Sequence, residues 1–203
     1  MASKKRSPTR GPIGRTVCFL DIDDVLCVND PYGGYDAAAA LAAERPAKRS
    51  AAVAPSADIW GSLFDAAACE HLRRINDEFR PCYVLTTSWW QALGEKRLRE
   101  TLVRGGLRWV VDSLHPDAVT PKIKGRKNRW AEIQAWLGAH PESRWVALDD
   151  ELSGTGLDLE LHGENGPFIV LCKESCGLRE AEYLRLRAAC LLRMEAGARE
   201  ERS

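Results

Sequence analysis

TVCFLD, at residues 16–21, is β-branched, aromatic or apolar until its final aspartate. A run without polar alternation fits a parallel strand that is buried on both faces of a sheet. Similar short runs recur along the chain, and they predict further strands of the same kind. They are CYVLTT (82–87), LRWVVD (107–112), RWVALD (144–149) and PFIVLC (167–172).

Helical patterns lie between these runs. In each pattern apolar residues repeat at the spacing of the buried side of an amphipathic helix. Strands that alternate with helices predict an α/β fold, built on a doubly wound, Rossmann-like parallel sheet. The repeating positions are Phe64, Ala68, Leu72, Ile75 and Phe79, then Trp130, Ile133, Trp136 and Leu137, and finally Leu184, Leu186, Cys190 and Leu191.

Composition limits the size and class of the protein. With 203 residues, of which 45% are hydrophobic, the chain is expected to close one core. Basic and acidic residues number 29 each, so any attraction of a charged partner must be local. The scattered cysteines are expected to be reduced and buried. Because no run is long and apolar enough for a membrane span or a signal peptide, we predict a cytoplasmic protein that does not bind membranes.

The chain is expected to form one catalytic domain over residues 16–195. Residues 1–15 contain several Lys, Arg, Pro and Gly but no acid, so we expect a disordered basic tail. Residues 196–203 form a charged C-terminal tail. Residues 28–58 are rich in Ala, contain Pro46 and interrupt the alternation, so they predict a small, irregular, cap-like insert with at most one short helix.

Polar side chains follow several of the predicted strands. Ligands of an open parallel sheet bind beyond the carboxyl ends of its strands, so we expect these side chains to converge. Neighbouring carboxylates need a cation or a proton to balance their charge, and their oxygens suit Mg²⁺. The alternative is that the first aspartates only cap a turn. The residues are Asp21 with Asp23 and Asp24, Thr86 with Thr87, and Asp149 with Asp150.

Three motifs resemble those of the haloacid dehalogenase (HAD) superfamily. FLDIDDVL at 19–26 is similar to its first motif, an apolar strand followed by Asp, any residue, Asp, any residue, and Thr or Val. VLTTSW at 84–89 resembles the second motif, a strand that ends in Thr or Ser, and WVALDDE at 145–151 resembles the fourth, a strand that ends in paired acids. They occur in the family's order, and the resemblance covers about residues 16–195. It implies a HAD-like hydrolase without a large cap.

The resemblance also implies a role for each matching residue. Asp21 would be the nucleophile that takes up the phosphoryl group, and Asp23 would be the general acid and base. Magnesium would be held by Asp21, by the backbone carbonyl of Asp23, and by Asp149 or Asp150. The second aspartate favours phosphoryl chemistry, because the family's dehalogenases lack it.

The second motif supplies the hydroxyl that is predicted to bind phosphate. Thr87 is the first choice, because it stands two residues before Trp89, and Thr86 is the second. Ser88 and Trp89 are predicted to contact the substrate. The alternatives are that both threonines are ordinary strand residues and that Trp89 belongs to the core.

The family's third motif is a Lys, sometimes an Arg, at the start of the helix before the acidic strand. KIKGRKNRW at 122–130 offers several basic residues, and spacing alone does not choose among them. Lys127 is the first choice and Arg129 the second, because both lie within a turn of the predicted helix. A cation is needed there to balance the nucleophile and the phosphoryl oxygens. The alternative is that most of this run is a solvated basic face.

These patterns predict a magnesium-dependent, phosphatase-type hydrolase of phosphate monoesters. An open cleft would suit a large phosphorylated substrate, such as a nucleic-acid end or a phosphoprotein, and the basic segments would suit a polyanion. A small metabolite would be preferred if the insert closes over the site as a lid. Two alternatives remain: transfer of the phosphoryl group to another acceptor, and a catalytically weak binding protein on the same fold.

Overall fold

The computed structural model describes residues 15–44, 59–123, 128–141 and 143–200. Its centre is a five-stranded parallel sheet with the strand order β3-β2-β1-β4-β5. The predicted α/β architecture with a parallel sheet is therefore confirmed. The strands are β1 (Val17–Leu20), β2 (Cys82–Leu85), β3 (Leu114–Val119), β4 (Trp145–Asp150) and β5 (Ile169–Cys172).

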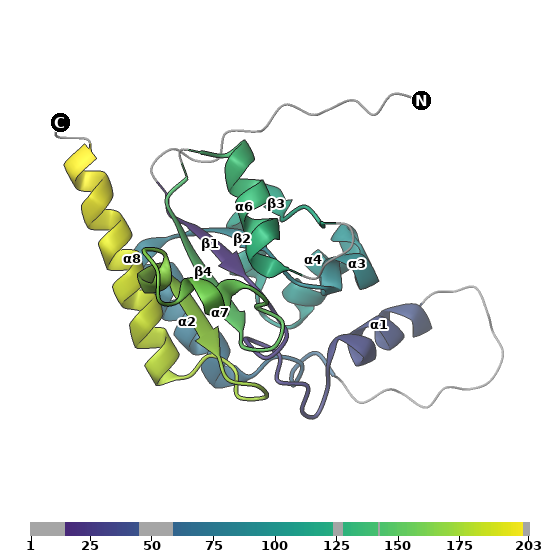
Figure 1. Cartoon of the computed structure of the whole chain (residues 1–203). Coiled ribbons are helices and arrows are strands. Elements are labelled where there is room, and N and C mark those ends of the chain that lie inside the picture. The colour runs from purple at the N-terminus through teal and green to yellow at the C-terminus, as the bar shows by residue number, and fades with distance from the viewer. Residues whose placement is uncertain (1–14, 45–58, 124–127, 142, 201–203) are drawn as a thin grey trace, which may run out of the picture.

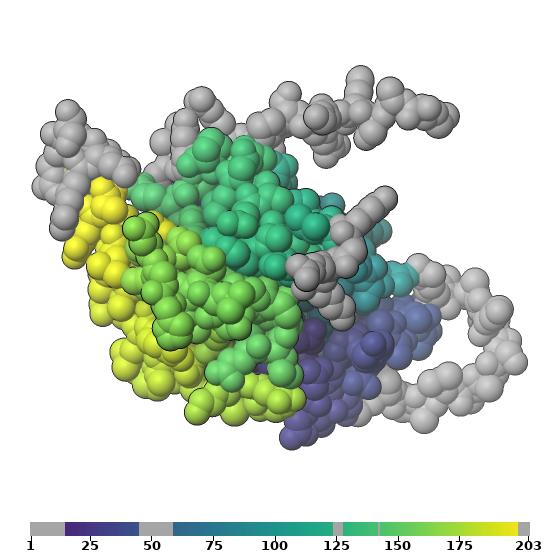
Figure 2. Space-filling view, viewed as in Figure 1, coloured from purple at the N-terminus to yellow at the C-terminus, as the bar shows by residue number. Residues whose placement is uncertain are grey.

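Helices cover both faces of this sheet (Figure 1). Helices α2 and α8 pack on one face, and α6 lies on the other. In the space-filling view, α8 (yellow) runs along one side of the molecule (Figure 2). The helices are α1 (Gly34–Ala43), α2 (Ala66–Phe79), α3 (Trp89–Leu93), α4 (Glu95–Arg104), α5 (Arg108–Asp112), α6 (Arg129–Ala139), α7 (Leu157–Glu160), the 3₁₀ helix η1 (Gly166–Phe168) and α8 (Glu180–Glu200).

The central strand β1 shows why its sequence is apolar at every position. Side chains of a strand point alternately to the two faces of the sheet. Cys18 and Leu20 belong to the core under α2 and α8, whereas Val17 and Phe19 belong to the core under α6. All of them are buried, so a polar residue at any of these positions would face a core.

One predicted strand is wrong. Residues 107–112 were expected to form a strand, but 108–112 form helix α5, and the edge strand β3 follows at 114–119. Leu107 and Val110 are buried, and their spacing of three residues places them on one side of a helical turn. Strand β3 contains Pro116, which an edge strand tolerates because one side of its backbone has no partner strand.

The structure describes the predicted tails and the predicted insert only in part. Residues 1–14 of the predicted tail and 45–58 of the predicted insert lie outside the described residues. The insert contains one short helix, α1. Helix α8 continues to Glu200, into the predicted C-terminal tail, because the Glu, Ala and Arg residues there favour helix. In the part of the chain that the structure describes, no helix has the length and apolarity needed to cross a membrane.

Candidate active site at the carboxyl ends of the strands

The sheet brings the predicted acidic clusters together. Asp21 follows β1, and its backbone N–H donates to the carbonyl of Leu148 in the neighbouring strand β4, at 3.0 Å. On the other side of β1, the N–H of Thr86 donates to the carbonyl of Leu20, also at 3.0 Å. The ends of β1, β2 and β4 are therefore in register, and Asp21 lies beside the paired acids of β4.

Three carboxylates form a buried cluster at this edge. One oxygen from each of Asp21, Asp149 and Asp150 lies within 4.8 Å of the others. Each of these residues is only 1% exposed. The carboxylate of Asp150 also accepts hydrogen bonds from the N–H groups of Leu152 and Ser153, at 2.7 and 2.8 Å, which fix its position.

Ser153 supplies a test of whether this cluster fits a cation. Its Oγ lies 3.2 Å from Asp21 Oδ2 and 2.9 Å from Asp149 Oδ1, and it also contacts Asp150 Oδ2. A hydroxyl has one proton and can donate to only one of these three oxygens. Its lone pairs therefore face at least one carboxylate oxygen, which is unfavourable unless a proton or a cation lies between them. An all-oxygen set of this kind suits Mg²⁺.

Among the residues that the structure describes, Arg129 brings a positive charge into contact with the cluster. Its Nη2 lies 3.3 Å from Asp21 Oδ1, and its Nε forms an ion pair with Asp149 Oδ2 at 2.8 Å, without the geometry of a hydrogen bond. Its Nη1 donates to the backbone carbonyl of Thr86 and to Glu132 Oε2. The side chain is 6% exposed. Arg129 therefore joins the ends of β1, β2 and β4 to helix α6.

The start of α6 holds Arg129 in this place. Asn128 is the N-cap of the helix, and its side chain accepts the N–H of Ala131 at 2.9 Å. The N–H of Arg129 donates to Thr155 Oγ1 at 3.2 Å. Arg129 was the second choice for the third motif, and the structure places it against the acids. Lys127, the first choice, lies outside the described residues.

Burial raises the pKa of two of these acids, Asp21 and Asp149. It raises the pKa of Asp21 well above the usual range, and the neighbouring charge of Asp149 raises it further, while Arg129 opposes both. Burial also raises the pKa of Asp149 to about 6, although Arg129 again opposes the change. One buried arginine does not fully compensate these acids, so an additional cation would favour their ionised, nucleophilic form.

Asp23 lies apart from the cluster, in the turn that follows Asp21. One of its carboxylate oxygens accepts the indole N–H of Trp89 at 2.8 Å, and the other accepts the hydroxyl of Ser88 at 3.4 Å. Burial raises the pKa of Asp23, and the hydrogen bond from Trp89 counteracts that rise. Ser88 is exposed, whereas Trp89 is 3% exposed.

Both threonines of the second motif are buried at the end of β2, and each has a different partner. The hydroxyl of Thr86 donates to Asp149 Oδ2 at 3.4 Å. Thr87 Oγ1 accepts the N–H of Trp89 at 3.2 Å, at the start of α3, and keeps its own proton to donate. The hydroxyl proton of Thr87 could therefore bond to a phosphoryl oxygen. The assignments of Thr87 as first choice and Thr86 as second choice for the phosphate-binding hydroxyl stay predictions.

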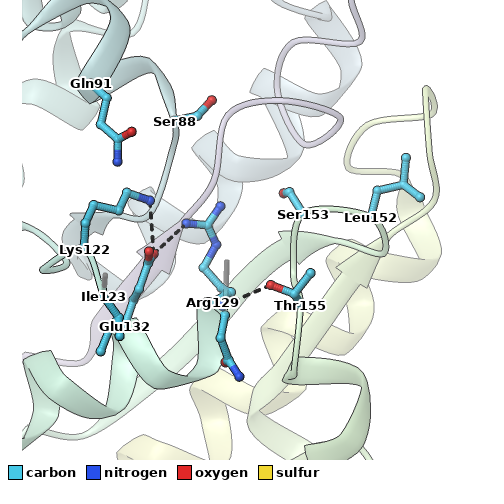
Figure 3. A pocket seen from close by; sticks show the side chains of 10 residues that line it. Ser88, Gln91, Lys122, Ile123, Arg129, Glu132, Leu152, Ser153 and Thr155 are labelled. Atoms are coloured by element: carbon cyan, nitrogen blue, oxygen red, sulfur yellow. Dashed lines mark hydrogen bonds and ion pairs between the residues drawn. The ribbon is translucent and has the colours of Figure 1, made fainter. Parts of the chain in front are cut away.

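A cleft opens beside these residues (Figure 3). Its volume is about 720 Å³, within the range of roughly 300–1,000 Å³ that is usual for ligand sites. In its wall, Glu132 Oε2 accepts from Lys122 Nζ at 3.1 Å and from Arg129 Nη1 at 3.2 Å. The lining residues come from the start of α3, the segment after β3, the start of α6 and the loop after β4: Ser88, Gln91, Lys122, Ile123, Asn128, Arg129, Glu132, Leu152, Ser153 and Thr155.

Sequence reasoning missed two residues of the site, Ser153 and Glu132. Ser153 stands three residues after the paired acids in DDELS, and a hydroxyl that close to two carboxylates is a usable signal. Glu132 follows Arg129 by three residues, which places the two side chains on one side of a helix. An acid at that spacing could have distinguished Arg129 from Lys127.

The comparisons with known proteins agree with this geometry. A family model described as "HAD domain in Swiss Army Knife RNA repair proteins" matches residues 17–183. The match begins with β1 and ends within α8, so it includes all five strands. Neither the search of curated proteins nor the search of solved structures found a match.

Proposed function

The chain belongs to the family of HAD domains in Swiss Army Knife RNA repair proteins, and on that premise we propose that it is a magnesium-dependent phosphatase acting on the phosphorylated ends of RNA. HAD domains are generally hydrolases. The observation that carries the proposal is the convergence of Asp21, Asp149 and Asp150 with Arg129 at one edge of the sheet. Asp23 follows two residues after Asp21, as in the first motif that the sequence resembles.

The first step would transfer the phosphoryl group to the protein. A carboxylate oxygen of Asp21 attacks phosphorus while the bond from phosphorus to the leaving oxygen breaks. Asp23, protonated beforehand, donates its proton to that oxygen, so the alcohol leaves uncharged. Arg129 holds Asp21 through its Nη2 and balances part of its negative charge. Thr87 is proposed to donate a hydrogen bond to a phosphoryl oxygen, and Ser88 is proposed to contact the substrate.

The second step would release phosphate. Asp23, now a carboxylate, takes a proton from water, and the water oxygen attacks phosphorus. The bond from phosphorus to Asp21 then breaks and restores both carboxyl groups. Splitting one displacement into two in this way lets the same acid and base serve both halves.

Magnesium would be held by Asp21, by the backbone carbonyl of Asp23, and by Asp149 or Asp150. When bound, it supplies the positive charge that lets an anionic nucleophile approach an anionic substrate. The contacts of Ser153 with three carboxylate oxygens support a cation at this position.

Two observations support a phosphorylated RNA end as the substrate. The family is described by its occurrence in RNA repair proteins. The cleft is also lined by an exposed cation, Lys122, which pairs with Glu132 and could contact a polyanion.

A substrate panel tests this proposal. Purified protein would be assayed with an aryl phosphate, a mononucleotide, a phosphopeptide and RNA oligonucleotides phosphorylated at either end, with magnesium and with chelator. We expect release of phosphate that requires magnesium and is most efficient for an RNA end. Efficient turnover of the phosphopeptide alone would contradict the substrate class. Transfer of phosphate to an added alcohol in place of water would indicate a phosphotransferase, and binding of RNA without any turnover would indicate a binding protein.

A further inference from the structure

Trp89 contacts Asp23 through its indole, and its ring has almost no exposed surface. It is 3% exposed, so a base or a sugar has little of it on which to stack. Its indole N–H instead points to Asp23 Oδ1, at 2.8 Å. This geometry suits a residue that holds Asp23 better than a residue that contacts a ligand.

The surroundings of Trp89 fix the position of that N–H. The indole stacks on Phe64, with ring centroids 6.0 Å apart and an interplanar angle of 26°. The backbone N–H of Trp89 donates to Thr87 Oγ1 at 3.2 Å, which ties the residue to the end of β2. The hydroxyl of Ser88, the residue before Trp89, donates to the second carboxylate oxygen of Asp23 at 3.4 Å. The start of α3 therefore holds both carboxylate oxygens of Asp23.

Helix α1 of the insert lies close to the indole of Trp89. Gly34, its first residue, lies so close that an added Cβ would be 2.7 Å from Cε2 and 2.8 Å from Nε1 of Trp89. Only a residue without a side chain allows the helix to approach the ring at this distance. The insert is thus in direct contact with the residue that holds Asp23.

We propose that Trp89 is a positioning residue, which orients the carboxyl group of Asp23 toward the leaving group and is itself held in place by Gly34 of the insert. The inference rests on the proposed function, in which Asp23 gives its proton to the leaving oxygen. A carboxyl group on a turn would otherwise rotate among several rotamers. A hydrogen bond from a rigid indole selects one of them, as the support of a catalytic group requires.

The test compares leaving groups. Trp89→Phe keeps an aromatic ring against Phe64 but removes the donor N–H. The variant would be assayed on a series of phosphate monoesters from nitrophenyl to alkyl. We expect turnover of the alkyl ester to fall about tenfold to a hundredfold, while the nitrophenyl ester, which needs little protonation, changes by less than about threefold. Trp90→Phe, the same change at the next residue of α3, is the matched control and should alter neither.

A double mutant and a second variant distinguish positioning from a general structural defect. If Trp89 acts through Asp23, adding Trp89→Phe to Asp23→Asn should cause little further loss. Gly34→Ala should reproduce the loss that depends on the leaving group, because the added Cβ would displace the indole of Trp89. Alanine favours helix more than glycine does, so a loss of helix α1 would not explain the effect. Gly138→Ala, in α6 with no atom within 4 Å of the added Cβ, is its control.

The outcomes separate this inference from the proposed function. Equal losses for all leaving groups, or losses that add to those of Asp23→Asn, would overturn the positioning role. A rise in KM for an RNA end, with an unchanged dependence on the leaving group, would instead assign Trp89 to substrate contact and also overturn it. If the wild-type protein hydrolyses none of the esters, the proposed function fails first.

Discussion

Arg129 contacts both Asp21 and Asp149 with a side chain that is almost wholly buried. Its guanidinium also donates hydrogen bonds to Glu132 and to the carbonyl of Thr86, so both its charge and its planar shape determine these contacts. A lysine would keep the charge but could not contact four groups in fixed directions. We therefore expect an arginine to serve better than a lysine at this position.

Replacement of Arg129 is expected to remove most activity. Arg129→Ala should lower turnover of an aryl phosphate by about a hundredfold or more, because the guanidinium that contacts Asp21 and Asp149 is lost. Arg129→Lys should retain part of the activity. Lys127→Ala, at the competing position of the third motif, should change turnover less than about threefold. A larger loss at Lys127 than at Arg129 would show that the third motif has been assigned to the wrong residue.

The titration of Asp149 predicts how stability depends on pH when no metal is bound. Its pKa of about 6 in the folded protein exceeds the value of about 3.9 for an exposed aspartate. Because the folded state holds this proton more tightly, the contribution of Asp149 to stability is fully present below a pH of about 4 and is lost as pH rises through about 6. Magnesium should oppose this loss, since it binds the ionised form.

Urea unfolding in chelator measures this effect. The free energy of unfolding of the wild type, relative to Asp149→Asn, should fall between pH values of about 4 and 7. The variant has no carboxyl at this position, so the comparison removes the contribution of groups that do not respond to the charge of Asp149 and keeps that of Asp149 with the neighbouring Asp21. Added magnesium should reduce the fall. If the two proteins keep a constant difference across this range, Asp149 does not titrate as described.

Helix α6 links local sequence to the site, because its first residue is Arg129. The cap of Asn128 fixes where the helix begins, and a shift of that start would move Arg129 away from the acids. We expect Asn128→Ala to cost about 1 kcal/mol of stability and to lower turnover by tenfold or so. Thermal unfolding and steady-state kinetics measure the two effects.

Asp65 provides a control for this prediction. It caps α2, where its side chain accepts the N–H of Ala68 at 2.8 Å, and it also pairs with Arg179. Asp65→Ala should cost at least as much stability as Asn128→Ala and should leave turnover at a permissive temperature unchanged. Equal loss of activity in both variants would mean that destabilisation, rather than the placement of Arg129, explains the effect.

The elements differ in how well their sequences reveal them. Strands β1, β2, β4 and β5 were predictable because apolar runs end in polar residues or turns. The stretch from 107 to 119 was not, since LRWVVD is as apolar as a buried strand, and the true strand contains Pro116 and polar side chains. Only pairing with β2 makes it a strand, and pairing is a tertiary property.

The same distinction applies to the site. Asp21, Asp149 and Asp150 were predictable because the ends of parallel strands must meet. The bond between Trp89 and Asp23 joins residues 66 positions apart and depends on the angle of α3, which no local pattern encodes. Arg129 could not be chosen from spacing, because the basic run before α6 offers several cations within one turn.

At the scale of the whole molecule, the chain has no net charge, so any attraction of the proposed RNA substrate must come from local basic segments. Removing residues 1–14, or neutralising Lys124 and Arg126, should raise the KM for a phosphorylated RNA end severalfold, more at low salt than at high salt. Turnover of a small aryl phosphate should hardly change, because contacts remote from phosphorus do not reach it. Unchanged RNA kinetics in these variants would argue for a small substrate.

The central claim is that Asp21 becomes phosphorylated during turnover, and acid-quenched labelling tests it most directly. The protein would be mixed with a substrate carrying labelled phosphate in the presence of magnesium, quenched, digested and analysed by mass spectrometry. The account predicts an acid-stable, base-labile phosphoryl group on the peptide that contains Asp21. It also predicts no label in Asp21→Asn and accumulation of label in a variant of Asp23 with an activated aryl phosphate. Turnover that persists in Asp21→Asn, or label on another residue, would contradict it.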